Sequence, residues 1–225
     1  MADRFNILNW LKNNDTSALQ VGLSVQTILN CKAGGTCSGG MALAVYRFAK
    51  THGIPHSSCE NYIAHDIDNP EEVCSGFNVC RDCKGPAPPV NSTGFENCWA
   101  VDSKNYYVSG YKSVIGPTEM KKEIVAHGPI ACGMQVTERF ELDYHNEIYE
   151  EKLLVPIMNH IVSIVGYGVS EEGTEYWIGR NSWGTYWGDL GFFKIKMHKH
   201  NLGIETACLA GYPTYDAPSV HEETE

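Results

Sequence analysis

Residues 159–191, NHIVSIVGYGVSEEGTEYWIGRNSWGTYWGDLG, contain the pattern from which the rest of the chain is interpreted. His160 begins an apolar run at residues 161–167, and a polar turn at residues 170–174 separates it from a second apolar run at residues 175–180. Two such runs joined by a short turn predict a β-hairpin. In a hairpin, the start of the first strand lies beside the end of the second, so the residue that follows the second run is expected next to His160.

That residue is Asn181, and Trp183 follows two positions later. An asparagine amide oxygen can accept the imidazole N–H, which fixes the tautomer and leaves the other ring nitrogen for a thiol. The indole of Trp183 could shield this hydrogen bond from water and strengthen it. A histidine beside an apolar strand is more often structural, and the Asn181–Trp183 stretch could simply be a tight turn with a packed indole. The pair His160 and Asn181 nevertheless predicts half of a nucleophilic site.

The composition is that of a folded protein of ordinary size. Of the 225 residues, 43% are hydrophobic and 20% charged, with a net charge of -10. This acidic balance argues against a nucleic-acid partner or an anionic membrane surface. The longest apolar runs are far shorter than the roughly 20 residues of a membrane span, so no membrane span is expected.

Nine cysteines and two glycosylation sequons, at Asn14 and Asn91, indicate the secretory route and disulfides. The chain nevertheless begins with MADRFNILNWLKNN, which is not a signal peptide. Met1, Phe5, Leu8 and Leu11 recur at helical spacing with no N-cap. We therefore expect this sequence to be truncated at its N-terminus, within a helix.

Helical patterns dominate the first half of the chain and strand patterns the second. Helices are expected at residues 1–11, 24–31, 41–52 and 117–127, and strands at residues 130–136, 161–167, 175–180 and 192–197. Residues 56–105 lack periodicity and contain five cysteines, which predicts bridged loops. The expected fold class is α+β. We expect a first lobe at residues 1–115, a second at 116–212, and a disordered acidic tail at 213–225.

The histidine and asparagine–tryptophan motifs together resemble the papain family (C1) of cysteine peptidases. The resemblance covers almost the whole chain, to about Pro213. It implies a helical left lobe, an antiparallel, β-barrel-like right lobe, and a cysteine–histidine pair that attacks peptide bonds, with His160 as base, Asn181 as its orienter and Trp183 in support. Gly39 and Gly40 match the segment that binds extended substrate, and Met41 would lie near the pocket for the second substrate residue.

The family's nucleophile belongs to a C-G-[SA]-C-[WY] box, and this sequence contains no such box. The resemblance pairs Cys31 with Cys74, Cys59 with Cys80, Cys83 with Cys98, and Cys132 with Cys208. Cys37 is then unpaired, and its family partner is the first cysteine of the absent box. The same missing segment accounts for the absent nucleophile and the uncapped first helix.

The expected function is a papain-type peptidase, a carboxypeptidase-like exopeptidase of lysosomal proteolysis, monomeric, and lysosomal or secreted. Its partners would be peptide or protein substrates. The chain as given is expected to be inactive, and the alternative is a pseudo-peptidase that binds peptides or a protein partner without cleaving. No cofactor and no metal are expected: Cys80 and Cys83 lack a second cysteine pair at zinc spacing, and His198 and His200 alternate on a solvated strand end.

Overall fold

A computed structural model describes residues 1–13, 20–85 and 97–217 of the chain. These residues fall into two units. The helical unit comprises Ala2, Arg4–Gly110 and the residues from Pro213 onward, and the sheet unit comprises Met1, Asp3 and Tyr111–Tyr212. The division after Gly110 lies five residues before the lobe boundary expected at residue 115. The α+β class expected from the sequence is confirmed.

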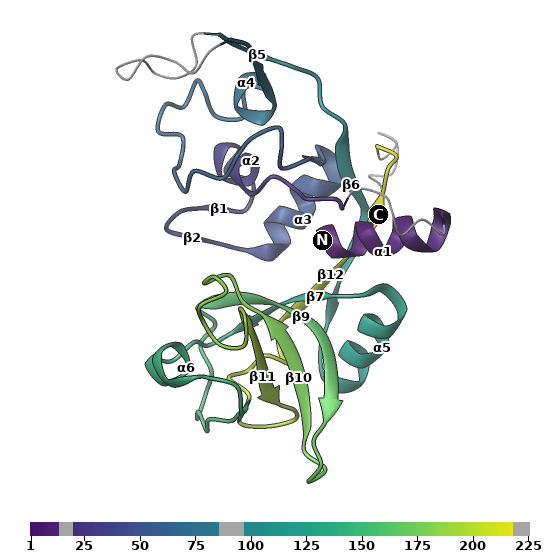
Figure 1. The fold of residues 1–225 in the computed structure, drawn as a ribbon, viewed down its shortest axis with the longest axis vertical. Coiled ribbons are helices and arrows are strands. Elements are labelled where there is room, and N and C mark those ends of the chain that lie inside the picture. The colour runs from purple at the N-terminus through teal and green to yellow at the C-terminus, as the bar shows by residue number, and fades with distance from the viewer. Residues whose placement is uncertain (14–19, 86–96, 218–225) are drawn as a thin grey trace. The chain divides into compact units, whose positions relative to one another are not determined.

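The helical unit consists of short elements joined by disulfide-bridged loops (Figure 1). Ser24 caps α2 by accepting a hydrogen bond from the Thr27 backbone N–H. Gly53, at φ +71°, follows the C-terminal end of α3, where a left-handed residue is favourable for glycine. The helices are α1 (Ala2–Asn13), α2 (Val25–Asn30), α3 (Ala42–Thr51) and α4 (Gly76–Val79), and the strands are β1 (Gly35–Thr36), β2 (Gly39–Gly40), β3 (Ile54–Pro55), β4 (Arg81–Cys83) and β5 (Cys98–Ala100).

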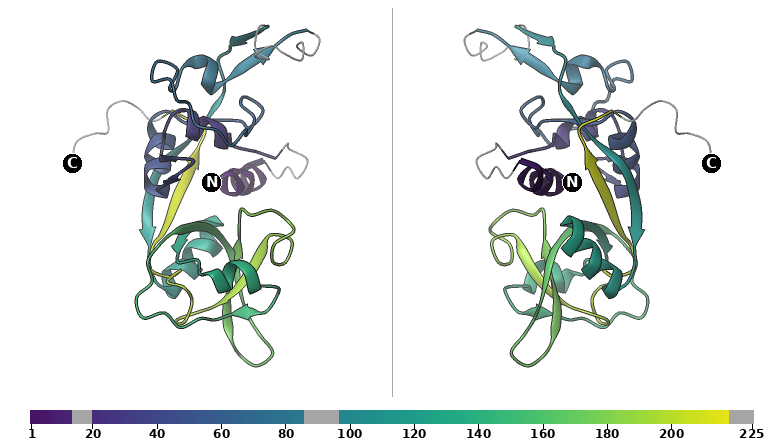
Figure 2. Two further views of the ribbon diagram at one scale, coloured as in Figure 1. Left: turned by 90° about the vertical axis from the view of Figure 1, so that its left-hand side faces the viewer. Right: turned by 90° about the vertical axis from the view of Figure 1, so that its right-hand side faces the viewer.

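The strands of the sheet unit belong to one sheet with the order β3-β6-β12-β7-β9-β10-β11-β8, of which β3 is part of the helical unit. α5 (Pro117–His127) contacts β7 and β9, and α6 (Glu138–Asp143) follows β7 in the chain (Figure 1 and Figure 2). The strands β6 and β12 run through the division between the units. The strands not yet given are β6 (Asn105–Val114), β7 (Ile130–Met134), β8 (Ile148–Tyr149), β9 (His160–Val169), β10 (Glu175–Arg180), β11 (Phe192–Lys196) and β12 (Cys208–Thr214).

The sheet differs from the expected antiparallel, barrel-like lobe at its β8 edge. β8 pairs with β11 in the parallel sense, through Ile148 opposite Lys194 and Tyr149 opposite Ile195. β8 is only two residues long, too short for its direction to be read from a hydrophobic pattern. The strand order has two ends, β3 and β8, so the sheet is open.

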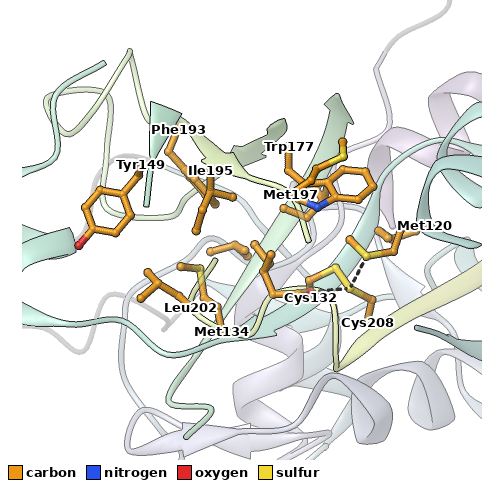
Figure 3. Close-up of a cluster of buried hydrophobic side chains, with 14 of the residues drawn as sticks. Met120, Cys132, Met134, Tyr149, Trp177, Phe193, Ile195, Met197, Leu202 and Cys208 are labelled. Carbon is orange, nitrogen blue, oxygen red and sulfur yellow. Dashed lines mark hydrogen bonds between the residues drawn. A yellow bond between two sulfur atoms is a disulfide. The ribbon is translucent and has the colours of Figure 1, made fainter. Parts of the chain in front are cut away.

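The core of the sheet unit is formed by side chains from the sheet strands, from α5 and from α6. Ile130, Cys132 and Met134 alternate inward along β7, and Met120 of α5 is fully buried among them. Figure 3 shows Met120 beside the Cys132–Cys208 disulfide, Met134 beside Leu202, and Trp177 beside Met197. Burial of large apolar side chains of this kind supplies most of the stabilisation of a domain.

Regular structure extends beyond the boundary expected at residue 212. β12 includes Pro213 and Thr214, and the ring of Tyr215 lies 5.6 Å from that of Phe5 in the same unit. The rest of the expected tail, residues 218–225, and the sequon residues Asn14 and Asn91 lie outside the described residues. None of the helices in the described part of the chain has both the length and the apolar character needed to span a bilayer.

Candidate active site

The hairpin of β9 and β10 positions the candidate site, as the sequence predicts. Glu175 lies opposite Val169 near the turn, and Arg180 lies opposite Ser163 near the open end. The register shifts by one residue at Gly179, whose missing side chain leaves room for the Phe193 ring: a β-carbon there would lie 2.1 Å from that ring. His160 begins β9, and the residue after β10 is Asn181.

The two side chains meet in a hydrogen bond, with His160 Nε2 2.9 Å from Asn181 Oδ1. The same Oδ1 accepts the backbone N–H of Ser182 at 2.8 Å. A backbone N–H can only donate, so the atom that faces both groups is the amide oxygen, and His160 Nε2 carries the hydrogen. This assignment leaves His160 Nδ1 as the basic nitrogen. Asn181 thus selects the tautomer as well as the orientation of the ring.

Trp183 covers this pair. Its ring stacks on His160 with a centroid distance of 5.1 Å and an interplanar angle of 29°. Asn181 Nδ2 is buried and has no hydrogen-bond partner among the described residues. An amide with one unpaired buried nitrogen is held by its oxygen alone, so the two hydrogen bonds to Oδ1 fix its rotation.

Two aromatic residues that sequence reasoning did not single out hold Trp183 in place. Trp187 packs edge-on against Trp183 at 4.9 Å, and its indole N–H donates to the Glu141 carbonyl at 2.9 Å. Phe140 of α6 is fully buried and contacts both indoles. The second tryptophan, four residues after Trp183, was the available sequence signal. Phe140 gave none, because it is the one buried residue of a six-residue helix.

Cys37 is the one free thiol among the described cysteines, and it is exposed. Its backbone N–H donates to the Asp66 carboxylate at 3.0 and 2.9 Å. Partial desolvation raises the pKa of the Cys37 thiol, and the charge and hydrogen bonding of Asp66 raise it further. A nucleophilic cysteine needs a lowered pKa, so the surroundings of Cys37 are those of an unactivated thiol. Cys37 belongs to the helical unit and His160 to the sheet unit.

The substrate-binding residues expected from the family resemblance also lie in the helical unit. Gly39 and Gly40 form β2, which pairs with β1, and Met41 precedes α3 with its side chain 69% exposed. A β-carbon at Gly40 would lie 2.4 Å from the Gly34 carbonyl oxygen, so this turn admits only glycine there. Gly39 has open space around it. That Gly39, Gly40 and Met41 bind substrate stays a prediction.

Four disulfides are present, with the pairing that the resemblance implies. They are Cys31–Cys74, Cys59–Cys80, Cys83–Cys98 and Cys132–Cys208. Cys80 and Cys83 therefore belong to different bridges. His198 Nε2 lies 2.8 Å from the Glu175 carboxylate, an ion pair when the histidine is protonated. The described part of the chain contains no group of three or more histidine, cysteine or acidic residues that could hold a metal ion.

A two-unit α+β fold with an asparagine-oriented histidine under an indole is the arrangement of a papain-type peptidase. The family model "Papain family cysteine protease" matches residues 8–212, so the chain belongs to the papain family. Within that family, the stretches LSVQTILNCKAGGTCSGG and NLGIETAC resemble cathepsin Z, also called cathepsin X.

Comparison with known proteins supports this placement. The chain is 40% identical over 222 residues to the cathepsin Z of Onchocerca volvulus, covering 95% of this chain and 65% of that protein. It is 29% identical over 199 residues to cathepsin B-like protease 1 of Arabidopsis thaliana, covering 87% of this chain and 50% of that protein. The chain thus spans between half and two thirds of these relatives. The procathepsin B S9 structure from Trypanosoma congolense shares the fold, with a TM-score of 0.69, 22% identity, and coverage of 95% of this chain and 66% of that chain.

Proposed function

We propose that the chain carries the histidine–asparagine half of a cathepsin Z-like cysteine peptidase that removes residues from peptide C-termini. The observation that carries the proposal is the pair of hydrogen bonds on Asn181 Oδ1, one from His160 Nε2 and one from the Ser182 amide. They leave Nδ1 of His160 as the nitrogen available to a thiol, under the cover of Trp183.

In the proposed reaction His160 takes the proton of a cysteine thiol at Nδ1, and the thiolate attacks the peptide carbonyl. The imidazolium then gives this proton to the leaving amine, and water releases the acyl group from the thiol. The Asn181 oxygen accepts the Nε2–H throughout, so the positive ring keeps a hydrogen-bond acceptor without a second charge. Trp183 limits the access of water to this bond, which makes the bond stronger.

The four disulfides support a lysosomal or secreted location, because such bridges persist in oxidising compartments. The likeness to cathepsin Z supports a peptidase that acts on peptide or protein substrates, and we propose that it acts as an exopeptidase and as a monomer.

Residues 1–225 by themselves are proposed not to hydrolyse peptides. They contain no C-G-[SA]-C-[WY] box, eight cysteines are in disulfides, and Asp66 disfavours the thiolate of Cys37. Loss of a nucleophile in a triad of this kind lowers the rate by several orders of magnitude.

The test uses a peptidyl epoxide probe and a peptide turnover assay on two proteins. Residues 1–225 should show neither turnover nor labelling above a Cys37→Ser control. A fusion that places a segment with a C-G-S-C-W box before Met1 should show both. In that fusion His160→Ala should abolish labelling, and Asn181→Ala should lower kcat/KM by about 10²–10⁴.

Turnover by residues 1–225 that disappears in Cys37→Ser would overturn the proposed inactivity. An unlabelled but folded fusion would overturn the peptidase assignment and favour a pseudo-peptidase that only binds peptides.

A further inference from the structure

Three large aliphatic side chains lie exposed on one loop of the sheet unit, between β8 and β9. Leu154 is 96% exposed, Val155 is 77% exposed and Ile157 is 73% exposed. Single exposed apolar residues are common on protein surfaces, whereas a group of them on one short segment marks a site of interaction. We call residues 154–157 the apolar tip.

The apolar tip is held firmly at both ends. Leu153, which precedes it, packs against the core of the sheet unit. The Ile157 backbone N–H donates to Gln135 Oε1 at 2.7 Å. Pro156 lies against Gly203, where a β-carbon would come within 2.8 Å of the proline Cβ. A loop fixed in this way loses little conformational entropy when it binds a partner.

A second loop, residues 198–203, lies beside the apolar tip, and we call it the histidine loop. The contact at Gly203 joins the two loops, and so does a hydrogen bond of 2.8 Å from the Glu151 N–H to the His200 carbonyl. His198 and His200 adopt φ +72° and +57°, in the left-handed region that is unfavourable for most side chains. Strain of this kind is often retained at functional sites.

The charge of the histidine loop depends on pH. His198 is exposed and His200 is half-buried. A histidine side chain ordinarily becomes positive below about pH 6.5. Lys199, between the two histidines, and Lys152, just before the apolar tip, are exposed and positive at every physiological pH. The surface formed by the two loops therefore becomes more positive in an acidic compartment.

Four carboxylates lie around the histidine loop: Glu175 contacts the His198 ring, Glu205 accepts the His198 N–H, and Glu150 and Glu151 lie beside His200. Each also binds a group outside the loop: Glu175 binds Lys121, Glu150 binds Lys196, Glu151 binds the Thr137 hydroxyl, and Glu205 binds the Trp177 indole N–H. The hydrogen bond and charge of Lys196 chiefly lower the pKa of Glu150, and the charges of His200 and Lys199 lower it further. These carboxylates therefore balance only part of the charge that the two histidines gain.

The charge of the whole chain changes in the same direction. The net charge of -10 at pH 7 counts all nine histidines as neutral. Their protonation would add nine positive charges, which nearly cancels the long-range repulsion between the protein and an anionic surface. The acidic composition thus argues against an anionic membrane surface near neutral pH, and not at acidic pH.

We propose that the apolar tip and the histidine loop together bind an anionic lipid surface at acidic pH, with Leu154 and Val155 entering the layer below the headgroups. Proteins that lie on a membrane bind through buried apolar area together with the attraction of positive groups to anionic lipids, and the two loops supply both. The apolar tip decides for a lipid surface over a soluble polyanion, because a polyanion would need only the charges. This binding needs no nucleophile, so it is independent of the proposed peptidase activity.

The experiment measures sedimentation of residues 1–225 with lipid vesicles. One set of vesicles contains phosphatidylcholine alone, and the other contains equal parts of phosphatidylcholine and phosphatidylserine. The protein should bind the anionic vesicles about tenfold or more tightly at about pH 5 than at about pH 7, because two histidines near the surface become charged. It should bind the phosphatidylcholine vesicles weakly at both pH values.

Two double variants and one matched control separate the two loops. Leu154→Ser/Val155→Ser should weaken binding to the anionic vesicles about tenfold or more at pH 5, with an unchanged melting temperature because both side chains are exposed. His198→Asn/His200→Asn should remove the gain at pH 5 and leave binding at pH 7 unchanged, and asparagine tolerates the left-handed backbone. Ile63→Ser removes an exposed aliphatic side chain of the helical unit and should leave binding unchanged at both pH values.

Equal binding of the anionic vesicles at both pH values, or equal binding by the wild type and either double variant, would overturn the inference. Binding that is lost in the histidine variant but kept in Leu154→Ser/Val155→Ser would identify a site for polyanions and would also overturn it. Failure of the proposed function appears elsewhere, as an unlabelled fusion or as turnover by residues 1–225.

Discussion

Replacement of Glu205 by alanine should destabilise the sheet unit strongly. The Glu205 side chain is buried, and its Oε1 accepts two hydrogen bonds: from the Trp177 indole N–H at 2.8 Å and from the His198 backbone N–H at 2.9 Å. Trp177 is fully buried in the core (Figure 3). Alanine offers neither donor an acceptor, and each buried unpaired donor costs about 1–3 kcal/mol.

The free energy of unfolding should therefore fall by about 2–6 kcal/mol in Glu205→Ala, a large share of the total for a domain. At roughly 2–4 °C for each kcal/mol, the melting temperature of the variant should fall by about 8–16 °C for a loss near 4 kcal/mol. Urea denaturation followed by tryptophan fluorescence and by circular dichroism measures the loss and tests whether unfolding is two-state.

Glu205→Gln is the matched control, since it keeps an oxygen acceptor and removes only the charge. It should cost about 1–2 kcal/mol, because neutral hydrogen bonds are weaker than charge-assisted ones. Trp177→Phe removes the indole donor. In the double variant Trp177→Phe/Glu205→Ala, the measured loss of unfolding free energy should be about 1–3 kcal/mol smaller than the sum of the losses in the two single variants. Equal losses in the alanine and glutamine variants, or strict additivity with Trp177→Phe, would refute the hydrogen-bond reasoning.

Three further predictions concern disulfides and titration. Replacing both Cys132 and Cys208 by serine should lower the free energy of unfolding more than the same change at Cys83 and Cys98, because the first bridge spans 76 positions and the second only 15. The loop-closure entropy gives a loss of about 4.5 kcal/mol for the first bridge and about 3 kcal/mol for the second, and urea denaturation of the two variants measures both. Burial raises the pKa of Tyr144 and of Tyr149 to about 12. The unfolded chain ionises near pH 10, so stability should fall between pH 10 and 12, by up to about 1.4 kcal/mol per pH unit for each tyrosine; Tyr149→Phe should reduce that slope in alkaline melting experiments. Hydrogen bonds and charge from His198 and Lys121 lower the pKa of Glu175. The ionised Glu175 side chain therefore stabilises the fold above the ordinary carboxylate pKa, and this stabilisation is lost as the pH falls through the lowered pKa of Glu175. Glu175→Gln should consequently reduce the fall in stability on the acid side of a stability–pH profile.

The candidate site was predictable because one hairpin creates it. The apolar runs before and after the turn set the register, and the register alone brings His160 and Asn181 together across 21 positions. The Ser170 N–H donates to the Thr174 carbonyl, which closes the turn that the polar residues predicted. The expected helices at α1, α2, α3 and α5 and the strands at β7, β9, β10 and β11 are confirmed for the same reason, since each has its own local pattern.

Other elements gave too little local signal. β6 buries only Val108 and Val114 among ten residues, so its alternation could not be told from a loop. β12 contains Pro213, which ordinarily argues against a strand. In both strands the backbone pairing comes from neighbours far away in the sequence, and such tertiary context overrides weak local preference.

The support of the candidate site shows why its deeper parts could not be predicted. Phe140 touches the rings of Trp183 and Trp187, more than 40 positions later in the chain, and α6 has no second buried residue to indicate which side faces inward. The position of Trp183 over His160 thus depends on side-chain packing between α6 and the loop after β10, two segments that are not paired as neighbouring strands. The stacking of the indole on His160 is therefore a property of the folded sheet unit, whereas the bond between His160 and Asn181 is already implied by the hairpin. A change at Phe140 should consequently disturb the cover of the histidine before it disturbs the hydrogen bond beneath.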